Sequence, residues 1–486
     1  MAAAAIMSRR ACQTHLPLRF FSSLTLSPAV RSSSATSSSP NLNLDDTEKL
    51  YASVPTGDLL SSLGLLYTMA VGPAVDLGMA VMRSPAVMEK RLLRAAVVGV
   101  VRRTVYRQFC AGEDAGEVGR RLGRLWESGL RAIVNYGMED AEDDTASDRN
   151  LAGFVKTVEM TAEMPPDSVS FACVKITAIC PIPLLERISD LLRWEKKHPS
   201  FHLPWKRPSL PILTNFSLLH HPLPAPPPSL TSEEELQLQL AHSRLLTLCK
   251  RCAESNLPLL VDAEYASVQP AIEYMTYSAA LEFNTTAERR RPIVYGTMQC
   301  YLKDAKERLV QAVEAAESAG ISIGFKLVRG AYLSRESVLA KSLGVASPIH
   351  ETIEETHNCY NDCAAFMLER MLKGSASVVL ATHNFDSGRA AAAKAEELGI
   401  GKGDQRLQFA QLMGMGDGLS LGLRNAGFQV SKYVPFGPVE QVIPYLLRRA
   451  QENRGFLSTS TLDRQLIMKE LKRRLKVAVI GKQLSE

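Results

Sequence analysis

From residue 129 onward, short β-like runs alternate with segments in which apolar residues recur at helical spacing. The helical segments include residues 301–318 and 387–398. Eight runs have strand character: Arg131–Tyr136, Val169–Ile179, Leu257–Asp262, Ile293–Cys300, Ile321–Val328, Ser377–His383, Leu407–Leu412 and Phe428–Tyr433. Eight strands alternating with helices are typical of a parallel (β/α)8 barrel. The pattern therefore predicts an α/β fold, with a distorted barrel of the TIM type over residues 129–460.

A doubly wound open sheet is the alternative arrangement of the same alternation. No GxGxxG follows the first strand, so a Rossmann dinucleotide site lacks support. Gly414, Gly416 and Gly418 do resemble a glycine loop. A turn between a strand and a helix accounts for that cluster equally well.

Residues 45–128 have helical patterning and predict an N-terminal helical arm. The most apolar stretch, Leu59–Met82, is interrupted by Gly72, Pro73 and Asp76. A membrane span needs about 20 mostly apolar residues without such interruptions. We therefore expect packed helices here in preference to a span.

Two further segments depart from the barrel pattern. Residues 194–232 carry a heavy load of proline, which forbids regular structure and favours an extended surface loop inserted in the barrel. Residues 461–486 predict a basic helical tail, with Lys472, Arg473, Arg474 and Lys476 on a solvated face.

The first 44 residues have the composition of an organellar transit peptide. They contain four arginines, no lysine and no acidic residue, and they are rich in Ser and Ala. Arginines spread among Ala, Leu and Phe favour the mitochondrion, whereas the serine run Ser32–Ser39 leaves a chloroplast alternative. A disordered tail without targeting function is the third interpretation.

The charge balance and the cysteine pattern argue against a nucleic-acid partner, a disulfide framework and a metal site. The net charge is +5, and removing the four arginines of the leader leaves +1, so no basic surface for nucleic acid is expected. Nine scattered cysteines form no disulfide framework. Cys249 and Cys252 form a CxxC without a second pair or a His cluster at zinc spacing, so no metal is expected.

Polar residues stand at the C-terminal ends of most predicted strands, where barrels of this type carry their chemistry. The set is Lys175, Asp262, Glu264, Gln299, Lys326, Arg329, His383, Asn384 and Tyr433. Burying so many polar groups without purpose is costly. The excess of lysine and arginine predicts a mouth that binds anions, either a phosphate-bearing cofactor, a carboxylate substrate, or both.

The helix after the last strand adds more cations. Pro438 opens it, and Tyr445, Arg448, Arg449 and Glu452 recur at spacings that share one face. Guanidinium groups grip carboxylate oxygens with a planar fork of donors. A solvated polar stripe is the alternative interpretation, but the position after the eighth strand favours a helix over the barrel mouth.

Two members of the polar set permit a different interpretation when each is taken alone. His383 by itself would more often be a hydrogen-bonded core histidine than a functional one. Lys175 could form a Schiff base, as in barrel aldolases. An aldolase is therefore the rival enzymatic hypothesis.

Four motifs in order along the chain resemble the proline dehydrogenase (proline oxidase) family, in its plant mitochondrial form. They are Val261–Glu264 (VDAE), Lys326–Tyr332 (KLVRGAY), Ala381–Asn384 (ATHN) and Tyr445–Asn453 (YLLRRAQEN). The resemblance covers about residues 129–456, apart from the insertion. It implies a barrel that holds FAD non-covalently and oxidises L-proline to Δ1-pyrroline-5-carboxylate, the first step of proline catabolism. A barrel that has lost flavin and serves as a regulatory binder is the non-enzymatic alternative.

The resemblance also implies residue roles. The carboxylate of proline would be bound by Lys175, Arg448 and Arg449, and the arginines would be ordered by Asp262 and Glu452. The pocket around the ring would be shaped by Leu412, Tyr433 and Tyr445, with Tyr433 favouring proline over hydroxyproline. The residues in contact with FAD would be Gln299, Lys326, Val328, Gly330, Ala331, Thr352 and His383.

Partners and location follow from the same resemblance. The electron acceptor would be a quinone, and the enzyme would contact the matrix side of the inner mitochondrial membrane as a peripheral protein. One departure concerns Lys326, where bacterial members carry Arg. Lysine keeps the charge but lacks the planar fork, so the hydrogen-bond geometry should differ.

Overall fold

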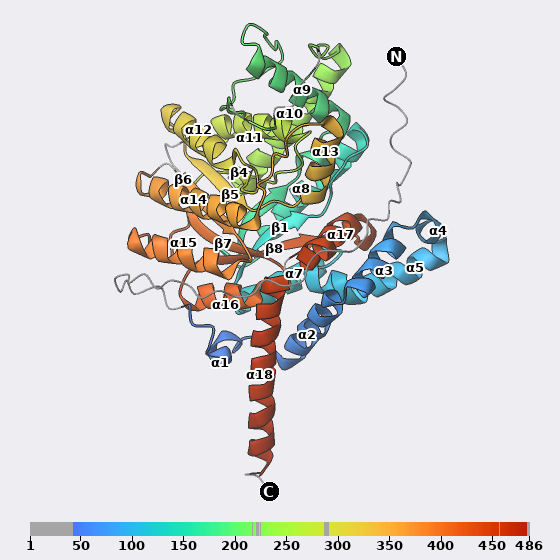
Figure 1. The fold of residues 1–486 in the computed structure, drawn as a ribbon, viewed down its shortest axis with the longest axis vertical. Coiled ribbons are helices and arrows are strands. Elements are labelled where there is room, and N and C mark those ends of the chain that lie inside the picture. The colour runs from blue at the N-terminus through green and yellow to red at the C-terminus, as the bar shows by residue number, and fades with distance from the viewer. Residues whose placement is uncertain are drawn as a thin grey trace. The chain divides into compact units, whose positions relative to one another are not determined.

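Eight parallel strands close into one barrel in the order of the chain, β1 to β8, as the alternation predicts (Figure 1). The computed structural model describes residues 42–215, 217–219, 223, 225–285, 291–374, 376–455 and 457–483, without the side chains of 74, 451–460 and 480–483. Residues 1–41, most of the expected transit peptide, lie outside this set. The strands are β1 (Arg131–Tyr136), β2 (Val169–Val174), β3 (Leu259–Val261), β4 (Val294–Gln299), β5 (Ile323–Val328), β6 (Ala376–Ala381), β7 (Leu407–Leu412) and β8 (Val430–Phe436).

All eight expected strands exist, and three differ clearly in extent. β3 keeps only Leu259–Val261 of the expected Leu257–Asp262. β2 ends at Val174, because Ile176–Ala178 forms a short 3-10 turn, η2, where the sequence predicts continued strand. β8 runs on to Phe436, because its pairing with β1 continues as far as Tyr136. Closure through the β1–β8 pair leaves no free sheet edge.

Helices cover the outside of the barrel between successive strands. They are α8 (Asp144–Thr161), α9 (Ile182–Lys197), α10 (Ser232–Glu254), α11 (Gln269–Phe283), α12 (Ala305–Ser318), α13 (Leu333–Leu343), α14 (Ile353–Leu372), α15 (Phe385–Glu397) and α16 (Asp417–Asn425). Inside the barrel, alternate strand residues including Ile133, Phe171, Leu260 and Val379 form a separate small core. The barrel is therefore a packed body that exposes chemistry only at its mouth.

The N-terminal arm consists mainly of helices, as expected. It contains α1 (Thr47–Leu50), α2 (Thr56–Ala70), α3 (Gly72–Arg83), α4 (Pro85–Met88), α5 (Arg91–Val101), a π-helical turn η1 (Arg102–Tyr106), α6 (Arg107–Phe109) and α7 (Ala115–Glu127). The apolar stretch breaks at Val71, where Gly72 and Pro73 start a new helix. No single described helix is long and apolar enough to cross a membrane, although α2 and α3, bent by 82°, pass the length and composition criteria together.

The proline-rich insertion has no helix or strand among its described residues from 198 to 231, as expected. It is nevertheless more than a surface loop, because Leu203, Leu213 and Leu219 are buried in the main core. Arg193 at the end of α9 anchors it, since its buried Nε donates to the Leu219 carbonyl at 2.6 Å. This segment packs because apolar side chains stand between its prolines.

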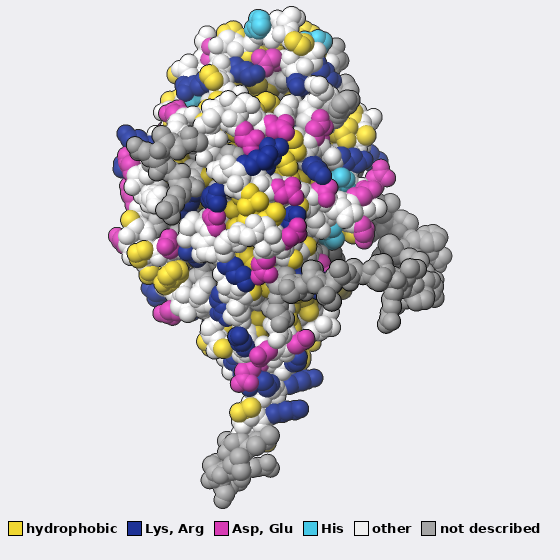
Figure 2. Space-filling view, turned by 90° about the vertical axis from the view of Figure 1, so that its left-hand side faces the viewer, with side chains coloured by type: hydrophobic (Ala, Val, Ile, Leu, Met, Phe, Trp, Pro, Cys, Tyr) yellow, Lys and Arg dark blue, Asp and Glu magenta, His cyan; other side chains and the backbone are white. Residues whose placement is uncertain are grey.

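The last two helices are α17 (Val439–Gly455) and α18 (Leu457–Gln483). The basic tail thus begins earlier than residue 461 and forms one long helix that projects from the barrel (Figure 1). Its Asp463 accepts hydrogen bonds from the backbone of Gly416 and Gly418, so the glycine cluster is a turn held by α18. On the face in Figure 2, basic and acidic side chains are interspersed, and neither forms a continuous patch.

Gly324 in β5 is a site where packing admits no side chain. A Cβ there would lie 2.3 Å from the ring of Tyr295, which is fully buried. We predict that Gly324→Ala lowers the free energy of unfolding by about 1–3 kcal/mol through overpacking. Gly64→Ala in α2, where a Cβ meets nothing within 4 Å, should instead stabilise by about 0.5–1 kcal/mol. Chemical denaturation of both variants checks this, and equal effects would contradict it.

Candidate active site

A cavity of about 490 Å³ opens at the C-terminal ends of the strands and is covered by α17. Its walls carry five cationic side chains, Lys175, Lys326, Arg329, Arg448 and Arg449, against the two acidic side chains of Asp262 and Glu354. The strand ends and α17 therefore converge as expected. The formal excess of positive charge makes this cavity suitable for anions.

Asp262, directly after β3, is the centre of the charge network. Its carboxylate accepts hydrogen bonds from Lys175 at 2.9 Å, from the Tyr433 hydroxyl at 2.8 Å and from the ammonium of Lys326. The thiol of Cys173 donates to it as well, at 3.1 Å. Asp262 is expected to order the arginines of α17, but its hydrogen bonds instead join β2, β5 and β8 across the barrel.

This network fixes the charge states of its members. Burial alone would raise the pKa of Asp262, but the ammonium groups of Lys175 and Lys326 outweigh it and hold the pKa well below the usual range. Burial would likewise lower the pKa of Lys175, and Asp262 instead raises it. A Schiff-base lysine must react as the neutral amine. The ion pair therefore argues against the aldolase alternative.

Two arginines of α17 enter the cavity from above. Arg448 forms a bidentate pair with Glu139, with nitrogen–oxygen distances of 2.8 and 2.7 Å. The Arg449 guanidinium, only 6% exposed, lies 4.9 Å from the centre of the Tyr445 ring. Both line the same cavity as Lys175 and Tyr433, so the arginines form part of one site and not a solvated stripe.

Arg329, just after β5, is held by neutral groups. It donates to His357 Nδ1 at 3.0 Å, to Thr382 Oγ1 at 2.6 Å and to Ser387 Oγ at 2.8 Å, and it stacks on the ring of Tyr360. None of these partners is acidic. Burial lowers the pKa of Arg329 accordingly. A fixed guanidinium without a countercharge among the described residues is suited to an anionic ligand.

His383 is uncharged in this structure. Burial, with further repulsion from Lys432 and Arg449, lowers its pKa to about 3. Its Nε2 accepts the backbone N–H of Leu412 at 3.0 Å, so the neutral ring carries its hydrogen on Nδ1. The ring therefore fixes the end of β7 and retains one donor.

Gln299 and Gly330 complete the wall opposite α17. The Gln299 side chain is held by donation from Nε2 to the Glu264 carbonyl at 2.7 Å. Gly330 has φ of 137°, and a Cβ there would lie 2.5 Å from the Tyr301 ring. Only glycine therefore fits, and the backbone itself forms the surface at this point.

The structure brings most of the predicted site residues to this one cavity. Those that line it are Lys175, Asp262, Gln299, Lys326, Val328, Gly330, Ala331, His383, Leu412, Tyr433, Tyr445, Arg448 and Arg449. Thr352 does not, because it is the exposed N-cap of α14 and accepts from the Glu355 backbone at 3.1 Å. Glu452 lies in α17 but outside the residues whose side chains the structure describes.

Glu139, the partner of Arg448, is the residue of this region that sequence reasoning misses. It lies three residues beyond the end of β1, and the predicted set of strand-end polar groups contains nothing from that strand. The signal is present, since Glu139 and Asp140 stand in the loop just after the first strand. Glu139 itself is not among the residues that line the cavity. Tyr332 and His357 line it without a role predicted from the sequence, whereas Asn384 belongs to the polar set expected at the strand ends.

Comparison with known proteins gives concordant results. The family model for proline dehydrogenase matches residues 118–461. The chain is 53% identical to proline dehydrogenase 1, mitochondrial, of Arabidopsis thaliana, covering 89% of this chain and 87% of that protein. It is 51% identical to proline dehydrogenase 2, mitochondrial, of the same plant, covering 93% of this chain and 94% of that protein.

A solved structure shares the fold. Proline utilization A of Bdellovibrio bacteriovorus, inactivated by N-propargylglycine, superposes with a TM-score of 0.60 at 18% identity. The alignment covers 84% of this chain but only 41% of the bacterial one, so this chain spans less than half the length of that protein. At that identity the likeness concerns the barrel architecture alone.

Glu264 gives this site a measurable pH dependence. It is 1% exposed and accepts from the Thr177 hydroxyl at 2.8 Å, and burial raises its pKa to about 7. The folded state thus holds the proton more tightly than the unfolded state, so ionisation destabilises the fold. The free energy of unfolding should fall as pH rises from about 4.5 to about 7, by about 3 kcal/mol from this group.

The isosteric variant Glu264→Gln should lose that component of the pH dependence. Denaturation of both proteins at about pH 5 and about pH 8 measures it, and the decline should be smaller in the variant. Equal declines would mean that Glu264 does not ionise in this range.

Proposed function

The chain belongs to the proline dehydrogenase family of oxidoreductases, and on that premise we propose that it oxidises L-proline to Δ1-pyrroline-5-carboxylate with bound FAD. The observation that carries this proposal is the cavity under α17 with five cationic and two acidic side chains. Such a cavity suits two anionic ligands, the carboxylate of an amino acid and the diphosphate of a dinucleotide.

Arg329 supports the fit to FAD. It lines the cavity, its hydrogen bonds go to neutral partners, and no acidic group among the described residues balances it. A diphosphate would supply the missing countercharge. Gln299, Lys326, Val328, Gly330, Ala331 and His383 would hold the rest of the cofactor, with His383 as a neutral Nδ1–H donor. When bound, FAD supplies the two-electron acceptor.

The substrate site lies where α17 meets the strand ends. Arg448, Arg449 and Lys175 would bind the carboxylate of proline, and Glu139 holds Arg448 in position through its bidentate pair. Leu412, Tyr433 and Tyr445 would pack around the ring. Such clamping supplies the fixed orientation that a direct transfer needs.

Tyr433 is immobilised from two sides. Its hydroxyl donates to Asp262, and the ammonium of Lys326 lies 5.1 Å from the centre of its ring. The side chain therefore cannot swing away to admit an additional ring hydroxyl. This favours proline over hydroxyproline as the substrate.

The same charges favour the reactive form of the substrate. The amine of proline must lose its proton before the C–N bond is oxidised, and an excess of cations disfavours a further ammonium ion nearby. Lys175 is protonated in its ion pair with Asp262, so it is not the base. We infer that solvent removes this proton as the substrate binds.

The electron acceptor and the cellular location are inferred from membership of the same family. We propose that the electrons pass to a membrane quinone and that the protein acts at the matrix side of the inner mitochondrial membrane, which it contacts peripherally. The Arabidopsis relatives are named as mitochondrial. The acid-free, arginine-bearing first 44 residues support import into that organelle.

An absorbance spectrum tests the function directly. We predict that purified protein is yellow and that L-proline bleaches its flavin band, whereas trans-4-hydroxy-L-proline at equal concentration bleaches it far more slowly. Colourless protein that binds proline would favour the regulatory barrel, and trapping of Lys175 by borohydride would favour the aldolase. Bleaching by another imino acid but not by proline would reassign the substrate.

Arg449 provides the test of the carboxylate site. A buried charge-assisted hydrogen bond is worth about 1.5–3 kcal/mol, so Arg449→Met should raise the KM for proline at least ~tenfold. Arg389→Met is the matched control, because Arg389 is an exposed arginine of α15. Steady-state kinetics compare the two, and an unchanged KM in Arg449→Met would remove this arginine from the substrate site.

A further inference from the structure

A second cavity, of about 910 Å³, lies between the N-terminal arm and the barrel, apart from the site above. One wall of the cavity is formed by α2 and α3, and another by η1 and α6. Its base is formed by the turn after β7 and the outer side of β8. No residue lines both this cavity and the active-site cavity. The catalytic scheme above leaves it without a ligand.

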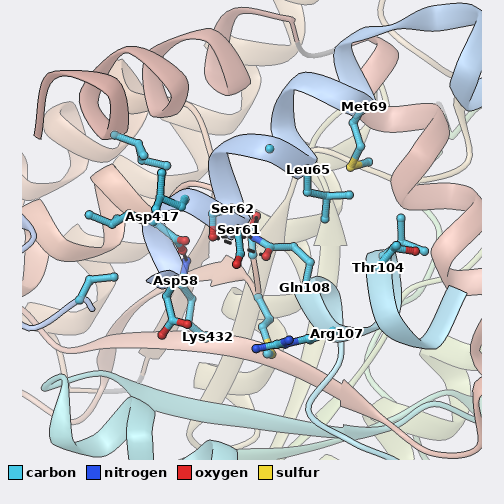
Figure 3. A pocket seen from close by; sticks show the side chains of 18 of the residues that line it. Asp58, Ser61, Ser62, Leu65, Met69, Thr104, Arg107, Gln108, Asp417 and Lys432 are labelled. Atoms are coloured by element: carbon cyan, nitrogen blue, oxygen red, sulfur yellow. Dashed lines mark hydrogen bonds and ion pairs between the residues drawn. The ribbon is translucent and has the colours of Figure 1, made fainter. Parts of the chain in front are cut away.

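The lining of this second cavity changes character along its length. Figure 3 shows Leu65 and Met69 toward one end and Asp58, Asp417 and Lys432 toward the other. Met79, Met82 and Val100 extend the apolar part along α3 and α5. The cavity therefore matches an amphipathic molecule with a polar head and a long aliphatic tail.

Hydrogen-bond donors gather in the middle and at the polar end. Gln108 Nε2 lies 3.3 Å from the Gly414 carbonyl and 3.4 Å from Ser62 Oγ, and Arg107 lines the cavity beside it (Figure 3). Lys432, 3% exposed, donates to the Met415 carbonyl at 2.8 Å and pairs with Asp417 at 2.6 Å. The Gln108 amide and the Lys432 ammonium already have these protein acceptors, so the guanidinium of Arg107 is the donor best suited to a head group that carries carbonyl oxygens.

The two cavities are separated by a single layer of protein. Successive residues of a strand point to opposite sides. Tyr433 of β8 thus lines the active site while its neighbour Lys432 lines the second cavity, and at the end of β7 the same holds for Leu412 and Met413. In α17, Tyr445 faces the active site and packs in one apolar cluster with Met69 of α2.

The apolar end of the cavity is lined by α3 and α5, two helices that also expose large apolar side chains. Leu77, Leu92 and Val100 are 67, 84 and 63% exposed, and Arg83, Lys90, Arg91 and Arg94 lie on the same arm. Apolar side chains with basic neighbours are typical of segments that rest on an anionic lipid surface. A molecule dissolved in that lipid would reach the cavity from this side.

We propose that this second cavity binds the oxidising co-substrate, a benzoquinone with an aliphatic tail, with its head near Gln108 and its tail along Met69, Met79 and Met82. The inference rests on the proposed function, which requires such an acceptor. The overall reaction balances. Proline loses two electrons and two protons as its C–N single bond becomes a double bond, and the quinone takes up two electrons and two protons to become the hydroquinone.

Gly64 of α2 permits a selective test. It lines the cavity, and a Cβ on it would meet nothing within 4 Å, so Gly64→Phe should fold and fill part of the space. We expect the KM for decyl-benzoquinone to rise at least ~tenfold, while the rate of flavin bleaching by L-proline stays within ~twofold of the unmodified chain. Gly57→Phe, in the same helix but outside the cavity, is the matched control and should change neither value.

A binding measurement complements the kinetics. A photoreactive azido-benzoquinone, irradiated with the full-length protein in the absence of proline, should label peptides of α2, α3 and the η1–α6 segment. Gly64→Phe should reduce that labelling several-fold, and Gly78→Phe in α3, another glycine of the cavity wall with open space, should do the same. The labelling on unmodified protein tests the proposal even if both variants fail to fold.

The outcomes separate this proposal from the proposed function. Absence of bleaching by proline in the unmodified protein would overturn the function itself. Bleaching with a quinone KM that is unchanged in Gly64→Phe, or labelling confined to other segments, would overturn only the assignment of the second cavity. Release of a co-purified lipid from Gly64→Phe without a change in quinone KM would assign the cavity to that lipid and overturn the proposal too.

Discussion

The carboxylate of Asp262 is the point on which the active site depends. It binds the ammonium groups of Lys175 and Lys326 and the hydroxyl of Tyr433, and so connects strands that are far apart in the sequence. A buried carboxylate without these partners would be very costly, as would the two lysines without it. The barrel can hold an excess of positive charge at its mouth because this one anion lies at the centre.

The remaining cations are arranged around that centre for binding. Arg448 is compensated by Glu139, whereas Arg329 is held in place by neutral donors and acceptors. Hydrogen bonds to neutral groups thus fix the orientation of Arg329 without neutralising its charge, whereas Glu139 both orients and neutralises Arg448. Rigid cations that keep part of their charge uncompensated can bind anionic groups without the cost of rearrangement.

Helix α17 and strand β8 each serve two spaces. Tyr445 and Arg449 face the active site, while Ala450 of the same helix lines the second cavity. Tyr433 and Lys432 divide in the same way on β8. A single strand and a single helix therefore separate the space for the substrate from the space assigned to its oxidant. At the end of the neighbouring strand β7, His383 of the active site accepts a hydrogen bond from the backbone of Leu412.

The sequence by itself determined the barrel, the N-terminal helical arm, the position of helix α17 over the barrel mouth and most of the polar residues at the strand ends. These depend on periodicity and on the order of elements, which local residue patterns encode. Tertiary structure alone decided which charges pair. Asp262 binds lysines and not the expected arginines, and Glu139 takes the role toward Arg448 that the sequence predicts for Asp262. Thr352 shows the same limit, since its side chain caps α14. Pairing depends on angstrom-scale distances between residues that lie far apart in the chain, and no spacing along the sequence records them.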